Sequence, residues 1–113
     1  GDEVLRAVAT TMEANVRRSD VVGRIGGEEF SVYLPNTSVA GAERLAEGLR
    51  QAIEALCPHI DGHTLNITAS IGVAAKTFEH QTMQVIQQLA DTAMYKAKKA
   101  GRNRVSTFGV VND

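Results

Sequence analysis

The chain has 113 residues, the length of one ordinary domain, and nothing in it indicates a second core or a linker. Hydrophobic residues make up 43% of the sequence and charged residues 22%, which argues against intrinsic disorder, a coiled coil and a collagen-like chain. The formal net charge of -1 argues against the strong positive field that a general nucleic-acid-binding protein needs.

The first third of the chain predicts a helix followed by a hairpin. Apolar residues recur at steps of three and four over residues 4–16, and Asp2 can cap the N-terminus of this helix. Residues 21–25 and 30–34 are short runs rich in β-branched or aromatic side chains. Because Gly26-Gly27 between them can form a tight turn, we expect the two runs to pair as antiparallel strands.

The middle of the chain predicts a second helix and further strands. Thr37 or Ser38 can cap a helix that ends before Pro58. The Asp61-Gly62 pair is typical of a hairpin turn. Over residues 64–75 apolar side chains alternate with polar or small ones, which predicts a strand.

The last third predicts a third helix and a final strand at residues 104–108. Thr82 can start the helix, and Gly101 can serve as its C-terminal cap. The side chains expected to pack inward from this helix are Val85, Ile86, Leu89, Ala90, Ala93, Met94, Tyr95 and Ala97.

The order of helix, hairpin, helix, strands, helix and strand predicts a single α/β domain. Its architecture is a sandwich in which helices cover a mainly antiparallel sheet. The chain starts at the cap of its own first helix, with no strand before it. We therefore expect an N-terminally truncated domain, from which the first strand and helix have been cut away.

The turn around Gly26-Gly27 has the composition of a site for a metal ion and phosphate. Glycines let the backbone approach a bulky ligand, and the adjacent carboxylates of Glu28 and Glu29 offer oxygen ligands to cations such as Mg²⁺. Since adjacent residues of a strand point to opposite faces, we expect one of the two carboxylates to be the main ligand of the cation. A solvated acidic hairpin tip without function is the alternative.

A cluster of cations lies around Gly101. Lys98 on the last helical turn and Arg102 on the loop after it can converge on one anion. Together with Lys96 and Lys99, Lys98 would also favour the C-terminal end of the helix dipole, so ordinary helix capping is the alternative.

The segment Gly26-Gly27-Glu28-Glu29-Phe30 resembles the signature pentapeptide of the GGDEF family of diguanylate cyclases, in the variant with glutamate in third place. The resemblance covers nearly the whole chain. It implies a nucleotidyl cyclase-like (ferredoxin-like) α/β fold, with residues 1–113 as the C-terminal portion of a single GGDEF domain. The family's opening strand, with its Asp-x-Asp-x-Phe-Lys pattern, is not in the sequence. Further segments that resemble family motifs in order and spacing are residues 1–5, 70–74, 90–98 and 101–103.

The resemblance implies a diguanylate cyclase that condenses two GTP molecules into cyclic di-GMP within a homodimer. The 3′-hydroxyl of each nucleotide attacks the α-phosphorus of the other and expels pyrophosphate. Glu28 would ligate Mg²⁺ (or Mn²⁺) and act as the candidate base, Glu29 would support the metal site, and Gly26 and Gly27 would let the backbone pass close to the phosphates. A catalytically inactive domain that binds cyclic di-GMP or GTP and acts as a regulatory module is the alternative.

Lys98 and Arg102, by the same resemblance, hold the β- and γ-phosphates of GTP, and Asp2 reads the guanine edge. A carboxylate can accept hydrogen bonds from the ring N–H and the exocyclic amine of guanine together, which adenine does not offer. Capping its own helix is the second natural role of Asp2.

Arg17 and Asp20 have the Arg-x-x-Asp form of the family's product-inhibition site for cyclic di-GMP. Arg17 could donate to O6 and N7 of guanine, and Asp20 could accept from the opposite edge. The second arginine of some family members has no match, because Gly48 stands in its place, which leaves Arg44 or Arg50 to substitute. A surface ion pair at a helix end is the alternative for Arg17 and Asp20.

The sequence also indicates a compartment. Cys57 is the single cysteine, which excludes an internal disulfide and fits a reducing cytoplasmic location. We expect its side chain to be buried. No apolar run approaches the ~20 residues of a membrane span, so we expect no direct membrane contact by this chain, while an anchor elsewhere in the parent protein stays open. His59, His63 and His80 are scattered and are expected at the surface rather than on zinc.

Overall fold

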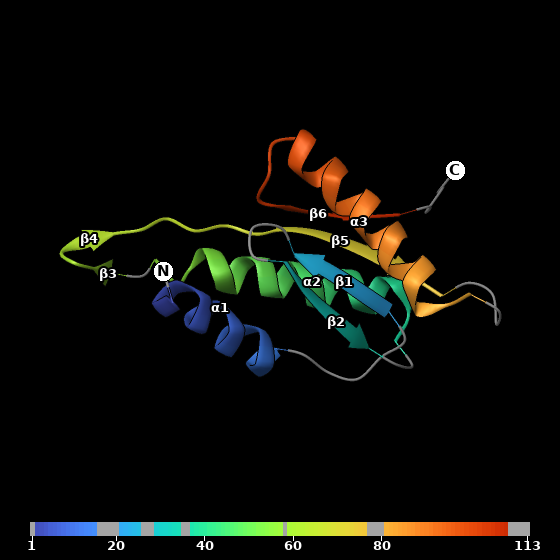
Figure 1. Ribbon diagram of the computed structural model, residues 1–113, viewed down its shortest axis with the longest axis horizontal. Coiled ribbons are helices and arrows are strands. Elements are labelled where there is room, and N and C mark those ends of the chain that lie inside the picture. The colour runs from blue at the N-terminus through green and yellow to red at the C-terminus, as the bar shows by residue number, and fades with distance from the viewer. Residues whose placement is uncertain are drawn as a thin grey trace.

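The computed structural model describes residues 2–15, 21–25, 29–34, 37–57, 59–76 and 81–108. Figure 1 shows helices arranged around a twisted sheet, with a small hairpin that projects away from it. The elements in chain order are α1 (Asp2–Asn15), β1 (Val21–Ile25), β2 (Phe30–Leu34), α2 (Val39–Glu54), β3 (His59–Ile60), β4 (His63–Thr64), β5 (Ser70–Ala75), α3 (Met83–Lys99) and β6 (Arg104–Thr107).

The main sheet has the strand order β2-β1-β5-β6. β1 runs antiparallel to both β2 and β5, whereas β5 and β6 are parallel. A parallel pair needs a crossover connection, and α3 supplies it between β5 and β6. The prediction of a mainly antiparallel sheet covered by helices is confirmed.

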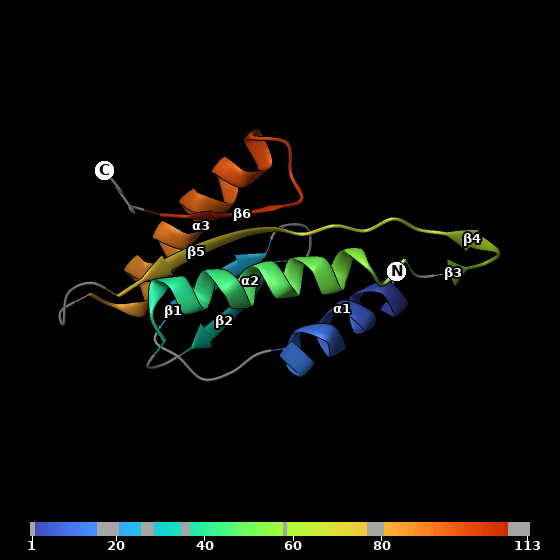
Figure 2. The same cartoon turned by 180° about the vertical axis from the view of Figure 1, so that it is seen from behind.

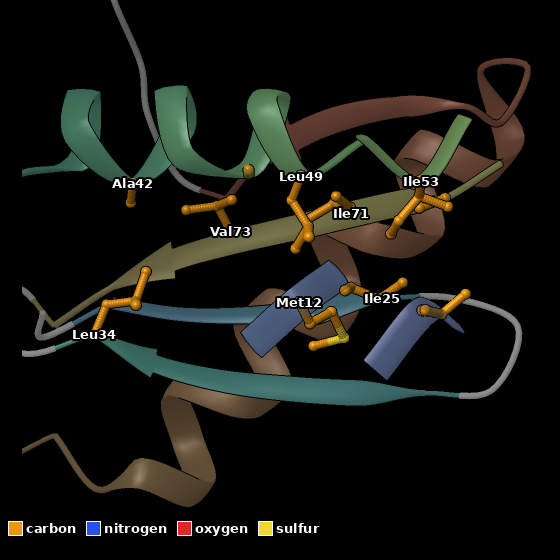
Figure 3. Close-up of a cluster of buried hydrophobic side chains, with 11 residues drawn as sticks. Met12, Ile25, Leu34, Ala42, Leu49, Ile53, Ile71 and Val73 are labelled. Carbon is orange, nitrogen blue, oxygen red and sulfur yellow. The ribbon is translucent and has the colours of Figure 1, made fainter. Parts of the chain in front are cut away.

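Helices cover both faces of this sheet. α2, with α1 packed beside it, lies on one face, and α3 lies on the other (Figures 1 and 2). Because side chains alternate along a strand, Ile71 and Val73 of β5 enter the core under α2, while Ala74 packs against α3. Figure 3 shows Leu49 and Ile53 of α2 directed toward this row of β5 side chains.

The contact between β5 and α3 is unusually close at Gly72. A Cβ atom placed on Gly72 would lie 2.0 Å from the carbonyl oxygen of Ala90 and 2.3 Å from the backbone nitrogen of Met94. Neither distance is compatible with van der Waals contact. The absence of a side chain at Gly72, together with the small residues Ala90 and Ala93 on α3, lets the helix backbone rest directly on the strand.

The N-capping residues of two helices were predicted correctly from the sequence. The Ser38 hydroxyl accepts a hydrogen bond from the Gly41 N–H at 3.0 Å, which caps α2. The Thr82 hydroxyl accepts one from the Val85 N–H at 3.2 Å, which caps α3. α1 begins at Asp2 itself, where a helix capped by Asp2 would begin one residue later.

The strand predicted over residues 64–75 is wrong in its first half. β5 contains only Ser70–Ala75, while His63–Thr64 pairs with His59–Ile60 in a separate hairpin. Within the described part of the chain no strand lies beside residues 65–69, which are mostly exposed. The alternating pattern therefore begins several residues before the first position that has a pairing strand in the described part of the chain. The final strand ends at Thr107, although the Phe108 N–H still donates to the Val73 carbonyl at 2.8 Å.

Three predictions of burial are also wrong. Met94 is buried as expected, but Tyr95 is 60% exposed, because one helical step of about 100° turns it away from the sheet. Its ring instead lies 5.5 Å from the Lys99 ammonium, a cation–π contact. Val85 is 39% exposed in the first turn of α3. Cys57 is exposed, since the chain has already left α2 there and turns back with a φ of 35°.

Two of the predicted surface histidines, His59 and His63, are exposed in the small hairpin, while His80 lies outside the described residues. None of the helices described is both long enough and apolar enough to cross a bilayer.

Candidate functional site

The first part of the candidate site is the end of the β1–β2 hairpin. Ile25 of β1 pairs with Phe30 of β2, so the hairpin predicted from the sequence is confirmed. Glu29 lies in the turn directly before β2 and is exposed. Gly26, Gly27 and Glu28 lie outside the described residues. The structure therefore presents one of the two predicted carboxylates at the end of the hairpin.

The chemistry of this hairpin end fits a hard divalent cation. Mg²⁺ is usually held by one or two carboxylates, several waters and the phosphates of a substrate, rather than by a cage of protein ligands. The ranges that the structure describes contain no group of three His, Cys, Asp or Glu side chains that could hold a metal alone. Two neighbouring glutamates combined with a triphosphate would satisfy the preference of Mg²⁺.

The second part of the candidate site is the turn between α3 and β6. The Arg102 N–H donates to the Ala97 carbonyl at 2.9 Å, and the Gly101 N–H donates to the Lys98 carbonyl at 3.3 Å. This pair of bonds is a Schellman motif, with Gly101 at a φ of 130° in the position after the C-cap. The prediction that Gly101 ends the helix is confirmed.

The side chains of this turn form a cationic surface. Lys98 is half-buried on the last turn of α3, and Arg102, two positions beyond the C-cap, is exposed. The backbone bonds of the turn use the carbonyls of Ala97 and Lys98, and the side chains supply the positive charge that a ligand would meet. The cations at this end of α3, in the turn and at the start of β6 are Lys96, Lys98, Lys99, Arg102 and Arg104.

The sheet brings these two parts to the same end of the molecule. Ile25 of β1 pairs with Ile71 of β5, and Ile71 pairs with Val105 of β6, so the three residues form one row across the sheet. The chain leaves β1 just beyond Ile25 and enters β6 just before Val105, on the same side of this row (Figure 1). Two strand spacings, about 10 Å, separate the ends. The acidic turn and the cationic turn are therefore close enough for one nucleotide to contact both.

A polar network that sequence analysis missed joins α2 to the cationic turn. Arg50 donates to both carboxylate oxygens of Glu47, at 2.9 and 2.6 Å, and to Glu54 at 3.2 Å. Its remaining bond goes to the side-chain oxygen of Asn103 at 2.8 Å, and the Asn103 amide donates to Glu54 at 2.8 Å. The spacing of Glu47, Arg50 and Glu54 signals contacts within a helix, but nothing in the sequence indicates Asn103.

Charge within this network shifts two pKa values. The hydrogen bond from Arg50, with a smaller one from Gln51, lowers the pKa of Glu47 to about 2. The same bond to Glu47 raises the pKa of Arg50 above its ordinary value, so the guanidinium stays charged.

The remaining predicted site residues are placed only in part. Arg17 and Asp20 lie outside the described residues, and the side chain of Asp2 is likewise not described, although its backbone starts α1. A Cβ atom on Gly48 would meet nothing within 4 Å, so that position faces open space. Arg50 is held by the network, and Arg44 is exposed on α2.

Comparison with known proteins identifies relatives that agree with one another in family. The family described as diguanylate cyclase, GGDEF domain, matches residues 1–104. Diguanylate cyclase A of Treponema denticola is 42% identical over 106 residues, which cover 94% of this chain and 29% of that protein. The chain thus spans less than a third of this relative's length.

Solved structures agree with the sequence relatives. The active GGEEF domain of a diguanylate cyclase from Vibrio cholerae has a TM-score of 0.78 and 33% identity, covering 97% of this chain and 69% of that one. The GGDEF domain of DgcB from Caulobacter crescentus, in complex with c-di-GMP, has a TM-score of 0.79 and 25% identity, covering 94% of this chain and 63% of that one. The letters GGEEF are also residues 26–30 of this chain.

Proposed function

Since this chain belongs to the GGDEF family of diguanylate cyclase domains, we propose that the protein containing it condenses two molecules of GTP into cyclic di-GMP. In each half-reaction the 3′-oxygen of one GTP forms a bond to the α-phosphorus of the other. The bond from that phosphorus to the bridging oxygen breaks, pyrophosphate leaves, and the hydroxyl proton passes to a base. The observation that carries the proposal is the shared end of the sheet at which the acidic and the cationic turn lie.

Glu28 and Glu29 are the carboxylates that we assign to the reacting end of the nucleotide. Glu28 is the metal ligand and the candidate base for the 3′-hydroxyl, and Glu29 supports the metal site. Mg²⁺, or Mn²⁺ in its place, would offset the charge of the triphosphate when bound. Gly26 and Gly27 would let the backbone pass close to the phosphates.

Lys98 and Arg102 are the cations that we assign to the β- and γ-phosphates. Arg102 can donate two parallel hydrogen bonds to phosphate oxygens, whereas Lys98 acts as a point charge. Their place on the Schellman turn supports this role, because the turn sets both residues at the end of the sheet where the hairpin ends. Asp2 is assigned to the guanine edge.

Cyclization of two GTP molecules needs two such sites face to face, so we propose a homodimer as the active form. Cyclic di-GMP is then both product and inhibitor, with Arg17 and Asp20 as the inhibitory site. A cytoplasmic location fits this chemistry, and Cys57, a free thiol, fits a reducing compartment.

The proposal is tested by incubating the complete protein with GTP and Mg²⁺ and following cyclic di-GMP and pyrophosphate by mass spectrometry. Glu28→Gln should lower turnover by at least ~100-fold, as expected when a metal ligand and base is lost. Asp61→Asn, an equal change of charge on the exposed β3–β4 hairpin, is the matched control and should keep the parental rate. Tight GTP or cyclic di-GMP binding without product would instead identify a regulatory module.

A further inference from the structure

The polar network around Arg50 connects two parts of the chain that are far apart in sequence. Asn103 lies 53 residues beyond Arg50 and 49 beyond Glu54, yet it bonds to both. The Arg50 side chain is only 15% exposed. Arg50 and Glu54 lie in the C-terminal half of α2, and Asn103 lies in the turn between α3 and β6, two elements that can be followed in Figure 2. The network therefore ties the cationic turn to a rigid helix that carries none of the proposed nucleotide contacts.

Hydrogen-bond chemistry permits only one orientation of each member. The Asn103 amide donates through nitrogen to the Glu54 carboxylate and accepts through oxygen from the Arg50 guanidinium. A flipped amide would set an acceptor against the carboxylate and a donor against the guanidinium. Arg50 in turn is fixed by its two parallel bonds to Glu47. Four of its five N–H donors are used, so it has little capacity left for a ligand.

The backbone conformation of the turn explains why it needs these stabilising hydrogen bonds. Arg102 and Asn103 have φ values of 63° and 47°, which place two consecutive residues other than glycine in the left-handed region. Asparagine tolerates this region, but arginine disfavours it. Such conformations persist only where surrounding contacts hold them, and they cluster at functional sites. Here the contacts come from the Schellman bonds of α3, from the Arg104 side chain on the Arg102 carbonyl at 3.2 Å, and from the network on α2.

We propose that Arg50, Glu54 and Asn103 are positioning residues that hold the α3–β6 turn in its left-handed conformation, so that Arg102 and Lys98 meet the same triphosphate. The inference rests on the proposed function, since it gives the turn a substrate to hold. The three residues do not contact the nucleotide themselves. They act by keeping the binding conformation of the turn populated before GTP arrives.

The expected size of the effect follows from that population. If the network is removed and the left-handed turn falls to about a tenth of the molecules, the apparent affinity for the triphosphate falls about tenfold. Affinity for guanosine, which has no phosphates, should not change. Loss of the Arg102 side chain should also abolish the effect of the network, because the turn then has no forked contact left to position.

The experiment measures binding of guanosine and of the α,β-methylene analogue of GTP, which cannot be condensed, to the complete protein by calorimetry. Asn103→Ala and Glu54→Gln should each weaken the analogue about tenfold and leave guanosine unchanged. The combination of Glu54→Gln with Asn103→Asp reverses donor and acceptor at constant net charge, and it should restore the analogue affinity. In an Arg102→Ala background, Asn103→Ala should have no further effect.

The outcomes separate this inference from the proposed function. Failure of the parent protein to bind the analogue overturns the proposed function and this inference with it. Normal binding by the parent and by both single variants overturns the inference alone, as does a drop in melting temperature with unchanged analogue affinity. If Asn103→Ala does not fold, the comparison of Glu54→Gln with the charge-balanced double variant decides the question.

Discussion

Gly72 offers the sharpest test of how the two layers pack. Replacing it with alanine adds a single methyl group, which would lie 2.0 Å from the Ala90 carbonyl oxygen and 2.9 Å from the Met94 Cα. Both contacts are backbone atoms of α3, so no side chain can rotate to make room. The helix as a whole must move away from β5 by more than 1 Å to reach about 3.4 Å, an ordinary contact distance.

The magnitude follows from what that movement disrupts. Ile86, Ala90 and Met94 are almost fully buried under the sheet, and a displaced helix loses close packing at each of them. Overpacking of a core typically costs 1 to 3 kcal/mol, and an unyielding backbone contact puts Gly72→Ala at about 3 kcal/mol or more. For a domain of this size the melting temperature should fall by roughly 10 to 20 °C.

Differential scanning calorimetry of the complete protein measures this shift. Gly48→Ala is the matched control, because it adds the same methyl group to an exposed helical position where nothing lies within 4 Å. Alanine should stabilise that position by about 0.5 to 1 kcal/mol through helix propensity. A melting temperature for Gly72→Ala within 2 °C of the parent would refute the reasoning, because a methyl group would then fit between β5 and the backbone of α3.

Three further predictions concern the site. Arg102→Ala should weaken binding of GTP by about 1.5 to 3 kcal/mol, the scale of a charge-assisted bond, while guanosine binding measured by calorimetry stays constant. Arg17→Ala should abolish cyclic di-GMP binding and relieve product inhibition in initial-rate assays, with the uninhibited rate near the parental one. Because the pKa of Glu47 is lowered to about 2 by Arg50 and Gln51, its contribution to stability is complete above pH 4.5 and is lost as the pH falls toward 2. The free energies of unfolding of the parent and of Glu47→Gln, measured by urea titration, should therefore differ by a constant amount of at most about 1 kcal/mol from pH 5 to 8, and converge below pH 4.5, since the side chain is 43% exposed.

The sequence by itself determined what depends on neighbours along the chain. Ser38 and Thr82 cap their helices as predicted, and Gly101 ends α3, because a cap is a bond between residues three or so positions apart. The hairpin of β1 and β2 forms as predicted, because its two strands are also close together along the chain. The pentapeptide within it indicated the family together with further short segments that match in order and spacing.

Only the tertiary structure decided which of these local features meet. The row of Ile25, Ile71 and Val105 sets the acidic and cationic turns at one end of the sheet, and strand order is not encoded in any single segment. The bonds of Asn103 to α2 span about 50 residues, so no periodicity could reveal them. The exposure of Tyr95 beside buried Met94 was decided in the same way, because the sheet contacts only one side of α3. Burial and long-range pairing depend on which surface another element covers, and that is a property of the packed molecule.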